Sequence, residues 1–262
     1  MVQLTRRNFF SSVGAAVVAP AAVIAPAALV APAAAITLEG APPTGASPPT
    51  TALASPEEKA VYLFFNNAEA RFIEAACERL IPADESGPGA LDAGVPNYLD
   101  KQLGGAWGAG ERLYRSGPWQ PGTASQGYQL PFTPAELFHT ALRAVNQDLE
   151  KRGKPFAELP VEAQDAYLKS LEGGGADLDG VPSAVFFEML LKMTVEGFFS
   201  DPVYGGNRNM VAWRMIGFPG AYADYYEAID RHGVKFEREP MSLAEDGKGR
   251  IHVHQNIPAN LT

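Results

Sequence analysis

The stretch AVFFEMLLKMTVEGFF, residues 184–199, is apolar on nearly every side of the helix that it would form. Its three charged residues, Glu188, Lys192 and Glu196, recur at every fourth position and therefore lie on one narrow line. A helix that is apolar almost all round needs burial on several sides. We therefore expect residues 184–199 to be the central helix of a bundle, with one face of a subunit interface as the alternative.

Four other helices are predicted from apolar residues that recur with the helical period. The clearest has Thr133 as its N-cap, Pro134 as its first helical residue and Glu136 in a capping box, and it ends at Gly153. The other three are predicted over residues 68–80, where Pro82 stops the helix, over 96–103 and over 161–171.

These patterns predict a mainly α protein with a single domain over residues 59–244, which resembles a helical bundle and has long irregular loops. A short strand or extended segment, AVYLFF at 60–65, is expected to open the domain. Asn66 or Asn67 would then cap the first helix. Residues 245–262 form a polar C-terminal tail.

The N-terminus resembles a twin-arginine export signal, which serves proteins that cross a membrane already folded. In TRRNFF, residues 5–10, the pair Arg6 and Arg7 precedes Phe9 and Phe10, and residues 11–35 carry no charge. Ala33, Ala34 and Ala35 offer a small-residue cleavage site, and three prolines within the uncharged run argue against a membrane anchor. We predict a cleaved signal over 1–35, followed by a flexible leader rich in Pro, Ser and Thr over 36–58.

Charge and cysteine content narrow the class of protein. The 262-residue chain has a net charge of −9, and loss of residues 1–35, which contain two arginines and no acidic residue, makes it about −11. Such an acidic chain is a poor partner for nucleic acid or anionic lipid. The single cysteine, Cys77, allows no internal disulfide, and its place on an apolar helix side predicts a buried small residue rather than a reactive thiol.

The sequence contains none of the motifs that hold common cofactors. The glycines of residues 104–110 do not fit a dinucleotide-binding loop, and one cysteine is too few for covalent haem or an iron–sulfur cluster. A serine nucleophile elbow is also missing. We therefore predict no catalytic residue, no cofactor and no metal in this chain.

The remaining titratable residues are assigned ordinary roles. Asp177–Gly180 is expected to be a turn rather than a calcium loop, because flanking oxygen ligands are missing. His252 and His254 could hold a metal from alternate strand positions, but they have no third ligand nearby. His139 and His232 are expected on helix surfaces. Solvated or capping roles are expected for three carboxylates: Glu196, Asp201 and Asp224.

The segment FFSDPVYGGNRNMVAWRMIGFPGA, residues 198–221, combines aromatic residues, turn formers and two arginines. Long irregular segments in compact domains are usually functional, and Tyr, Trp, Met and Arg are the types that anchor interfaces. The alternative is a loop whose rings fold back over the core. We predict a partner interface made of Phe198, Phe199, Tyr204, Asn207, Arg208, Trp213, Arg214 and Phe218.

Two stretches resemble one known family, the gluconate 2-dehydrogenase subunit 3 family. They are ERLIPADESGPGALDAGVPNYLDKQL, residues 78–103, and EGFFSDPVYGGNRNMVAWRMIGFPG, residues 196–220. The likeness extends over about residues 62–244, and it includes a twin-arginine leader. Members are the small subunits of membrane-bound, flavin-dependent sugar and sugar-acid dehydrogenases.

The resemblance implies a complex in which other subunits do the chemistry. A large flavoprotein of the glucose-methanol-choline type binds FAD and oxidises the substrate, and a multihaem cytochrome c passes electrons to quinone. The small subunit has no cofactor. It binds and stabilises the flavoprotein and carries it through the twin-arginine translocase. The mature chain would then be periplasmic, without a membrane span of its own and attached to the membrane through its complex.

A second hypothesis is a self-sufficient periplasmic protein, either a small-molecule binder or an uncharacterised enzyme such as a hydrolase. It predicts ligand binding or activity from the purified chain alone. A structural envelope protein is a third hypothesis, which would call for repeats or an anchor. The substrate of the proposed complex does not follow from this sequence, because specificity would lie in the large subunit.

Overall fold

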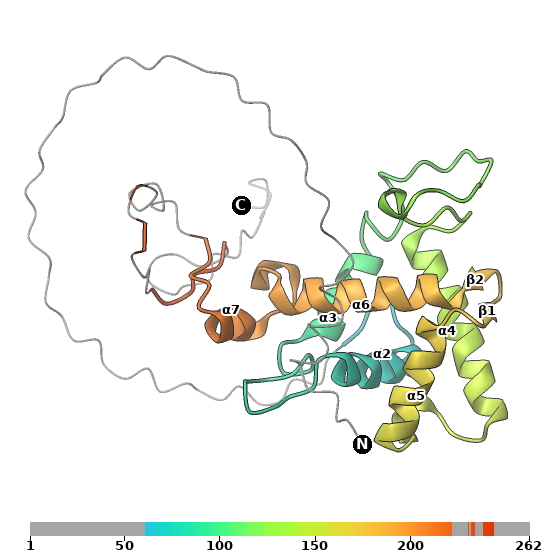
Figure 1. The fold of residues 1–262 in the computed structure, drawn as a ribbon, viewed down its shortest axis with the longest axis horizontal. Coiled ribbons are helices and arrows are strands. Elements are labelled where there is room, and N and C mark those ends of the chain that lie inside the picture. The colour runs from blue at the N-terminus through green and yellow to red at the C-terminus, as the bar shows by residue number, and fades with distance from the viewer. Residues whose placement is uncertain (1–60, 222–229, 231, 234–237, 244–262) are drawn as a thin grey trace, which may run out of the picture. The chain divides into compact units, whose positions relative to one another are not determined.

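The structure, a computed structural model, describes residues 61–221, 230, 232–233 and 238–243 (Figure 1). This part of the chain contains six α-helices, one pair of two-residue strands and four 3-10 turns. The helices are α2 (Asn67–Leu80), α3 (Val95–Leu103), α4 (Pro134–Lys151), α5 (Val161–Glu172), α6 (Ser183–Phe199) and α7 (Val211–Ile216). The strands are β1 (Asp177–Leu178) and β2 (Val181–Pro182), and the 3-10 turns are η1 (Ala124–Gln126), η2 (Phe156–Glu158), η3 (Pro202–Tyr204) and η4 (Arg208–Met210). The prediction of a mainly α protein is confirmed.

The helix α6 is the one around which the others pack. It contacts α2, α3, α4, α5 and α7, and Figure 1 shows it running from the β1–β2 pair at one end to α7 at the other. Phe186, Leu190 and Thr194 have no exposed surface, whereas the charged line of Glu188, Lys192 and Glu196 faces solvent. The prediction of a central helix is therefore confirmed.

Local signals fix the helix ends. The Asn66 side chain accepts hydrogen bonds from the N–H groups of Ala68 and Glu69, and the Glu69 carboxylate accepts from Asn66 N at 3.0 Å. Thr133 and Glu136 form the same reciprocal pair at the start of α4. These capping boxes satisfy backbone donors that the first helical turn leaves without partners. The five predicted helices consequently begin and end within one or two residues of the observed bounds.

The extended segment before α2 does not form a strand. The carboxylate of the buried Asp100, on α3, accepts from the backbone N–H groups of Leu63, Phe64 and Phe65 at 2.9, 2.9 and 3.0 Å. Because one side chain takes these three donors, residues 63–65 bend round it instead of pairing with another strand. The strand alternative for AVYLFF is wrong within the described residues 61–65.

Two further predictions need correction. Asp177–Gly180 is a turn, as expected, but it joins two short antiparallel strands that the sequence did not indicate. Residues 198–221 are less irregular than predicted, since they contain η3, η4 and the six-residue helix α7. An element this short has fewer than two full turns, so its period cannot be recognised in the sequence.

The core between α2, α4, α5 and α6 is largely aromatic. The ring of Phe72 lies 4.8 Å from that of Phe156 and 6.4 Å from that of Phe186, which also packs edge-on against Phe138 at 5.4 Å. All four rings are buried. A fully buried ring of this size stabilises a fold by roughly 1.5 to 3 kcal/mol. This cluster holds α6 to its neighbours.

Cys77 lies within the same core. Its side chain is buried, and its Sγ is 3.6 Å from the Thr194 hydroxyl on α6. Burial raises the pKa of the thiol to about 12. The prediction of a small buried residue rather than a reactive thiol is confirmed.

We expect the stability of the domain to fall as the pH rises above about 9. The folded-state pKa of Cys77 exceeds its ordinary value of 9.0, so the thiol ionises at a lower pH in the unfolded chain than in the folded one. Ionisation therefore favours the unfolded chain between about pH 9 and pH 12, and the free energy of unfolding falls over this range. Tyr98 and Tyr128 add to the loss above their ordinary value of 10.0, because burial raises the pKa of each to about 12. Urea midpoints measured at about pH 7, 9 and 11 check this. The decline should be shallower in Cys77→Ala, and an unchanged midpoint at the highest pH would contradict it.

Candidate partner-binding surface

The structure divides the eight predicted interface residues into two groups. Inside the domain lie Phe198, Asn207 and Trp213, with Phe199 half-buried. At the surface lie Tyr204, Arg208, Arg214 and Phe218. The three buried side chains offer almost no area to another protein in this conformation, because they fill the junction between α6 and α7. In this conformation they support the exposed residues, and contact of the predicted interface residues with a partner stays a prediction.

Asn207 joins the end of α6 to the start of α7. Its side-chain amide donates to Ser200 O at 2.9 Å, and its Oδ1 accepts from Ala212 N at 2.9 Å. Its φ of 44° lies in the left-handed region, which asparagine adopts more readily than most residues. Next to it, Gly206 packs so closely on α6 that a Cβ there would overlap the carbonyl of Gly197. The turn can pass here only because residue 206 has no side chain.

The backbone beyond Asn207 is strained. Asn209 and Met210 also have positive φ angles, 56° and 55°, and Met210 is buried. A left-handed residue other than glycine costs roughly 1 to 2 kcal/mol. The surrounding contacts must therefore hold the turn in place, and one of them is the indole N–H of Trp213, which donates to Phe199 O at 2.9 Å.

The two stretches quoted in the sequence analysis lie against each other. Arg208 N donates to Ala93 O at 2.9 Å, and Gly94 turns with a φ of 71° beneath the Arg208 side chain. Further along, Gly197 leaves room for the ring of Tyr98, which a Cβ would approach to 2.8 Å. Residues 78–103 and 196–220 thus build one structural unit.

A later segment, residues 238–243, returns to this unit. Met241 N donates to Pro219 O at 3.1 Å, and Met241 O accepts from Ala221 N at 2.8 Å. The Asp201 carboxylate accepts from Leu243 N and from the Ser242 hydroxyl, both at 2.8 Å. Asp201 also caps η3, so its predicted capping role is confirmed. Nothing in the sequence indicated this return, because its pairing is with residues about 20 to 40 positions away.

Together these elements expose a group of large apolar side chains. We call it the apolar patch: Val203, Tyr204, Ile216, Phe218 and Leu243, each between 44% and 68% exposed. Residues 238–243 connect its members, since Met241 bonds the stretch after Phe218 and Leu243 bonds the cap of η3. Beneath it, the buried Trp213 packs edge-on against Phe218 at 5.1 Å.

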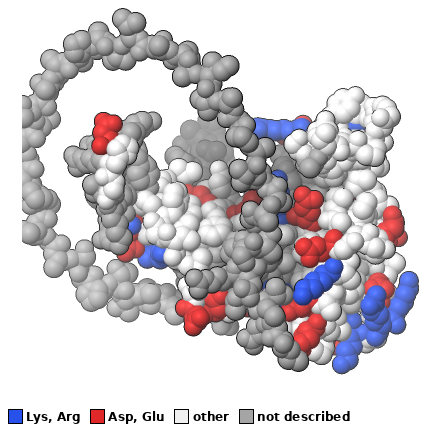
Figure 2. Space-filling model, viewed as in Figure 1, with Lys and Arg blue, Asp and Glu red and all other residues white. Residues whose placement is uncertain are grey.

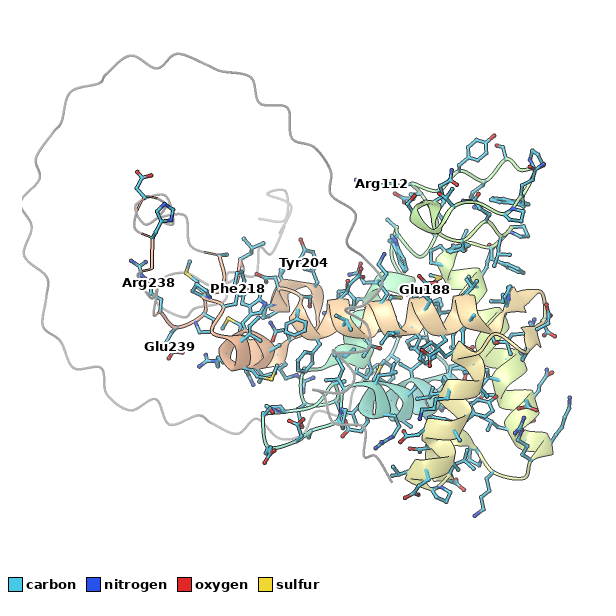
Figure 3. All side chains as sticks on the ribbon, in the orientation of Figure 1. Arg112, Glu188, Tyr204, Phe218, Arg238 and Glu239 are labelled. Atoms are coloured by element: carbon cyan, nitrogen blue, oxygen red, sulfur yellow. The ribbon has the colours of Figure 1, made fainter. Side chains whose placement is uncertain are left out.

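The edge of the patch is charged. Arg214 forms an ion pair with Glu239 at 2.9 Å. Figure 2 shows mostly uncharged residues over α7, whereas many acidic and basic residues lie over α4 and α5. In Figure 3, Tyr204 stands at the α7 end of α6 and Phe218 beyond it. An apolar centre with a polar rim is the usual anatomy of a protein interface.

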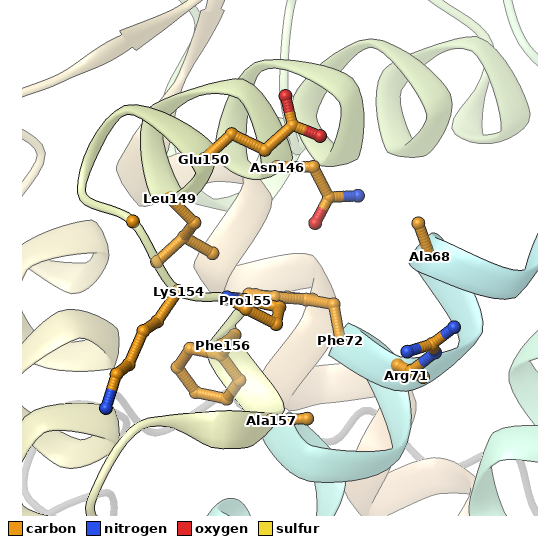
Figure 4. Close-up of a pocket in the computed structure, with 11 residues that line it drawn as sticks. Ala68, Arg71, Phe72, Asn146, Leu149, Glu150, Lys154, Pro155, Phe156 and Ala157 are labelled. Atoms are coloured by element: carbon orange, nitrogen blue, oxygen red, sulfur yellow. The ribbon is translucent and has the colours of Figure 1, made fainter.

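A pocket of about 380 Å³ lies elsewhere, between α2, α4 and η2 (Figure 4). Its floor is Phe72 and Phe156, and Asn146 points into it from α4. Charged side chains of both signs surround it: Arg71, Glu150 and Lys154. The volume suits a small ligand, and the lining contains no Ser, Thr, Cys or His. No motif in the sequence indicated a site at these residues.

Other predicted sites are placed as follows. Among the described residues, no three His, Cys, Asp or Glu side chains come together as a metal site. His139 is on the surface of α4, where it stacks on Phe64 at 4.1 Å and bonds Glu69 at 3.0 Å. His232 is exposed in a turn instead of on a helix. The remaining candidates lie outside the described residues: Arg6, Arg7, Phe9, Phe10, Asp224, His252 and His254. None of the described helices combines the length and the apolar character that crossing a membrane requires.

Comparison with known proteins identifies the family. No curated protein and no solved structure matches the chain significantly. A family model described as gluconate 2-dehydrogenase subunit 3 matches residues 67–220. This match covers more than half of the chain, from the start of α2 to the glycine that pairs with Met241, and includes both quoted stretches in full. The chain therefore belongs to the gluconate 2-dehydrogenase subunit 3 family.

Proposed function

We propose that this chain is the non-catalytic small subunit of a gluconate-type dehydrogenase complex. It binds and stabilises a large FAD-dependent flavoprotein, and its own twin-arginine signal carries that flavoprotein to the periplasm. Membership of the family supports a dehydrogenase partner. The observation that carries the proposal is the apolar patch, which is built on the unit formed by the two family motifs.

The patch has the composition and the support that protein binding needs. Its five side chains are exposed, and burying a large apolar side chain fully contributes roughly 1.5 to 3 kcal/mol before ordering costs. The strained turn under the patch is held by Asn207 and Trp213, so little further ordering is needed on binding. Arg208 and Arg214 at the surface would set the orientation of the partner.

The redox chemistry belongs to the other subunits in this proposal. FAD is bound by the glucose-methanol-choline-type flavoprotein, and haem c by a cytochrome subunit that links the complex to the membrane. The small subunit is periplasmic and reaches the membrane only through its complex. Export of a folded, flavin-loaded partner explains why a chain without a cofactor motif would carry a twin-arginine signal.

Replacing Arg6 and Arg7 by lysine should leave both this chain and the flavoprotein in the cytoplasm. The substitution keeps the charge but removes the arginine pair that the translocase recognises. Cell fractionation with a dehydrogenase assay and immunodetection of this chain measures the effect. As a matched control, Arg112→Lys with Arg115→Lys makes the same chemical change at two exposed positions and should leave export normal. Flavoprotein that still arrives in the periplasm at the normal level would contradict the proposal.

A further inference from the structure

A small notch lies between α3 and α6. Its volume is about 140 Å³, and five residues line it: Tyr98, Gln102, Trp107, Met193 and Glu196. We call it the α3/α6 notch. Trp107 is 45% exposed, which is unusual for so large a ring. The notch brings together a carboxylate, an amide and two aromatic rings from three parts of the chain.

The walls of the notch are held in place by packing. Gly197 lacks a side chain, and the Tyr98 ring occupies the space that one would fill against α6. Burial, with the neighbouring Glu196 carboxylate, raises the pKa of Tyr98 to about 12, so the hydroxyl stays protonated next to that carboxylate. The Glu196 side chain is 46% exposed, which leaves its charge accessible from outside.

Size and chemistry together select one kind of occupant. Pockets for free small molecules usually measure about 300 Å³ or more, so a notch of about 140 Å³ suits a single side chain from another protein. Aromatic faces and a carboxylate both attract a cation, and arginine and lysine can place a charged head there with the stem against the rings. Resting on the proposed function, we propose that the α3/α6 notch receives a basic side chain of the flavoprotein partner.

The charges around the notch agree with this assignment. Lys192 lies 3.9 Å from Glu196 one turn away on α6, with side chains 72% and 46% exposed. Such an exposed pair is weak and readily exchanged for a better placed cation. The net charge of −9 also favours a partner with a basic surface. Besides burial, both Glu196 and Tyr204 contribute to the raised pKa of Tyr98, so the notch and the apolar patch are near enough for one partner to cover them.

The test compares two carboxylates on the same exposed line of α6. Glu196→Gln removes the charge in the notch, and Glu188→Gln removes one two turns away, outside it (Figure 3). The dissociation constant of the full chain and its co-purifying flavoprotein should rise roughly tenfold for Glu196→Gln and less than about twofold for Glu188→Gln. Trp107→Leu should also weaken binding, and combining it with Glu196→Gln should add little, since both changes act on one bound cation.

Salt provides an independent readout. The affinity of the wild-type chain should fall with ionic strength more steeply than that of Glu196→Gln. Equal affinities for Glu196→Gln, Glu188→Gln and the wild type would overturn the proposal that the notch receives a basic side chain, while the proposed function would stand. A wild-type chain that binds no flavoprotein would instead overturn the proposed function itself. Circular dichroism of each variant checks that the fold is intact.

Discussion

Replacing Ile216 and Phe218 by aspartate should release the flavoprotein from this chain without unfolding it. The two side chains are 57% and 44% exposed, so aspartates at these positions stay hydrated in the free subunit. In the complex, each would be buried without a partner for its charge, which costs several kcal/mol. We expect the affinity to fall by at least roughly 100-fold. Co-purification of flavin absorbance with the tagged chain measures the loss.

The controls separate binding from folding. Val161→Asp adds a charge at an apolar residue that is 49% exposed on α5, far from the patch in sequence and in structure. It should leave co-purification unchanged, because an acidic residue is also favourable in the first turn of a helix. Far-ultraviolet circular dichroism and the urea unfolding midpoint should remain close to native in the double variant. If the flavoprotein is retained in full by that folded variant, the apolar patch is not the binding surface.

The sequence indicated this segment but could not show which of its residues are buried and which are exposed. Aromatic residues among turn formers indicated a functional segment at residues 198–221. The same composition, however, fits rings that pack inside the domain as well as rings that are exposed to a partner. Which ring is buried depends on contacts such as the one from the Trp213 indole to Phe199 O. The part played by Leu243 was beyond prediction, since it rests on a hydrogen bond to Asp201, 42 residues earlier.

The helices were predictable because their signals are local. Capping at Asn66 and Thr133 involves residues three positions apart, and the apolar period of α6 is contained within the helix itself. The strand alternative for the segment before α2 was wrong for the opposite reason. Its apolar residues have the composition of a strand, but their N–H groups are taken by a carboxylate more than 30 residues away.

Replacing Asp100 by alanine should therefore cost the domain more stability than other single polar substitutions. Three backbone donors lose their acceptor at a site where Asp100 is only 5% exposed. An unpaired buried donor costs about 1 to 3 kcal/mol, and of the three bonds only the one from Phe65 N is buried, so we expect a loss of roughly 1 to 3 kcal/mol in the free energy of unfolding. Asp100→Asn keeps one acceptor oxygen and should lose less. Urea unfolding followed by circular dichroism measures both.

A matched control is Asp177→Ala, which removes one exposed hydrogen bond to Gly180 N and should cost less than about 1 kcal/mol. Asp100 lies in the first family motif, yet its bonds fix Leu63–Phe65, and Phe64 in turn stacks on His139. We therefore expect Asp100→Ala to lower the amount of folded chain while each folded molecule binds the flavoprotein as tightly as before. The double variant Ile216→Asp with Phe218→Asp should instead keep the amount of folded chain and lose the affinity for the flavoprotein. If Asp100→Ala instead kept full stability but no longer bound the flavoprotein, the carboxylate would be part of the binding surface. Its role in fixing residues 63–65 would then not be the important one.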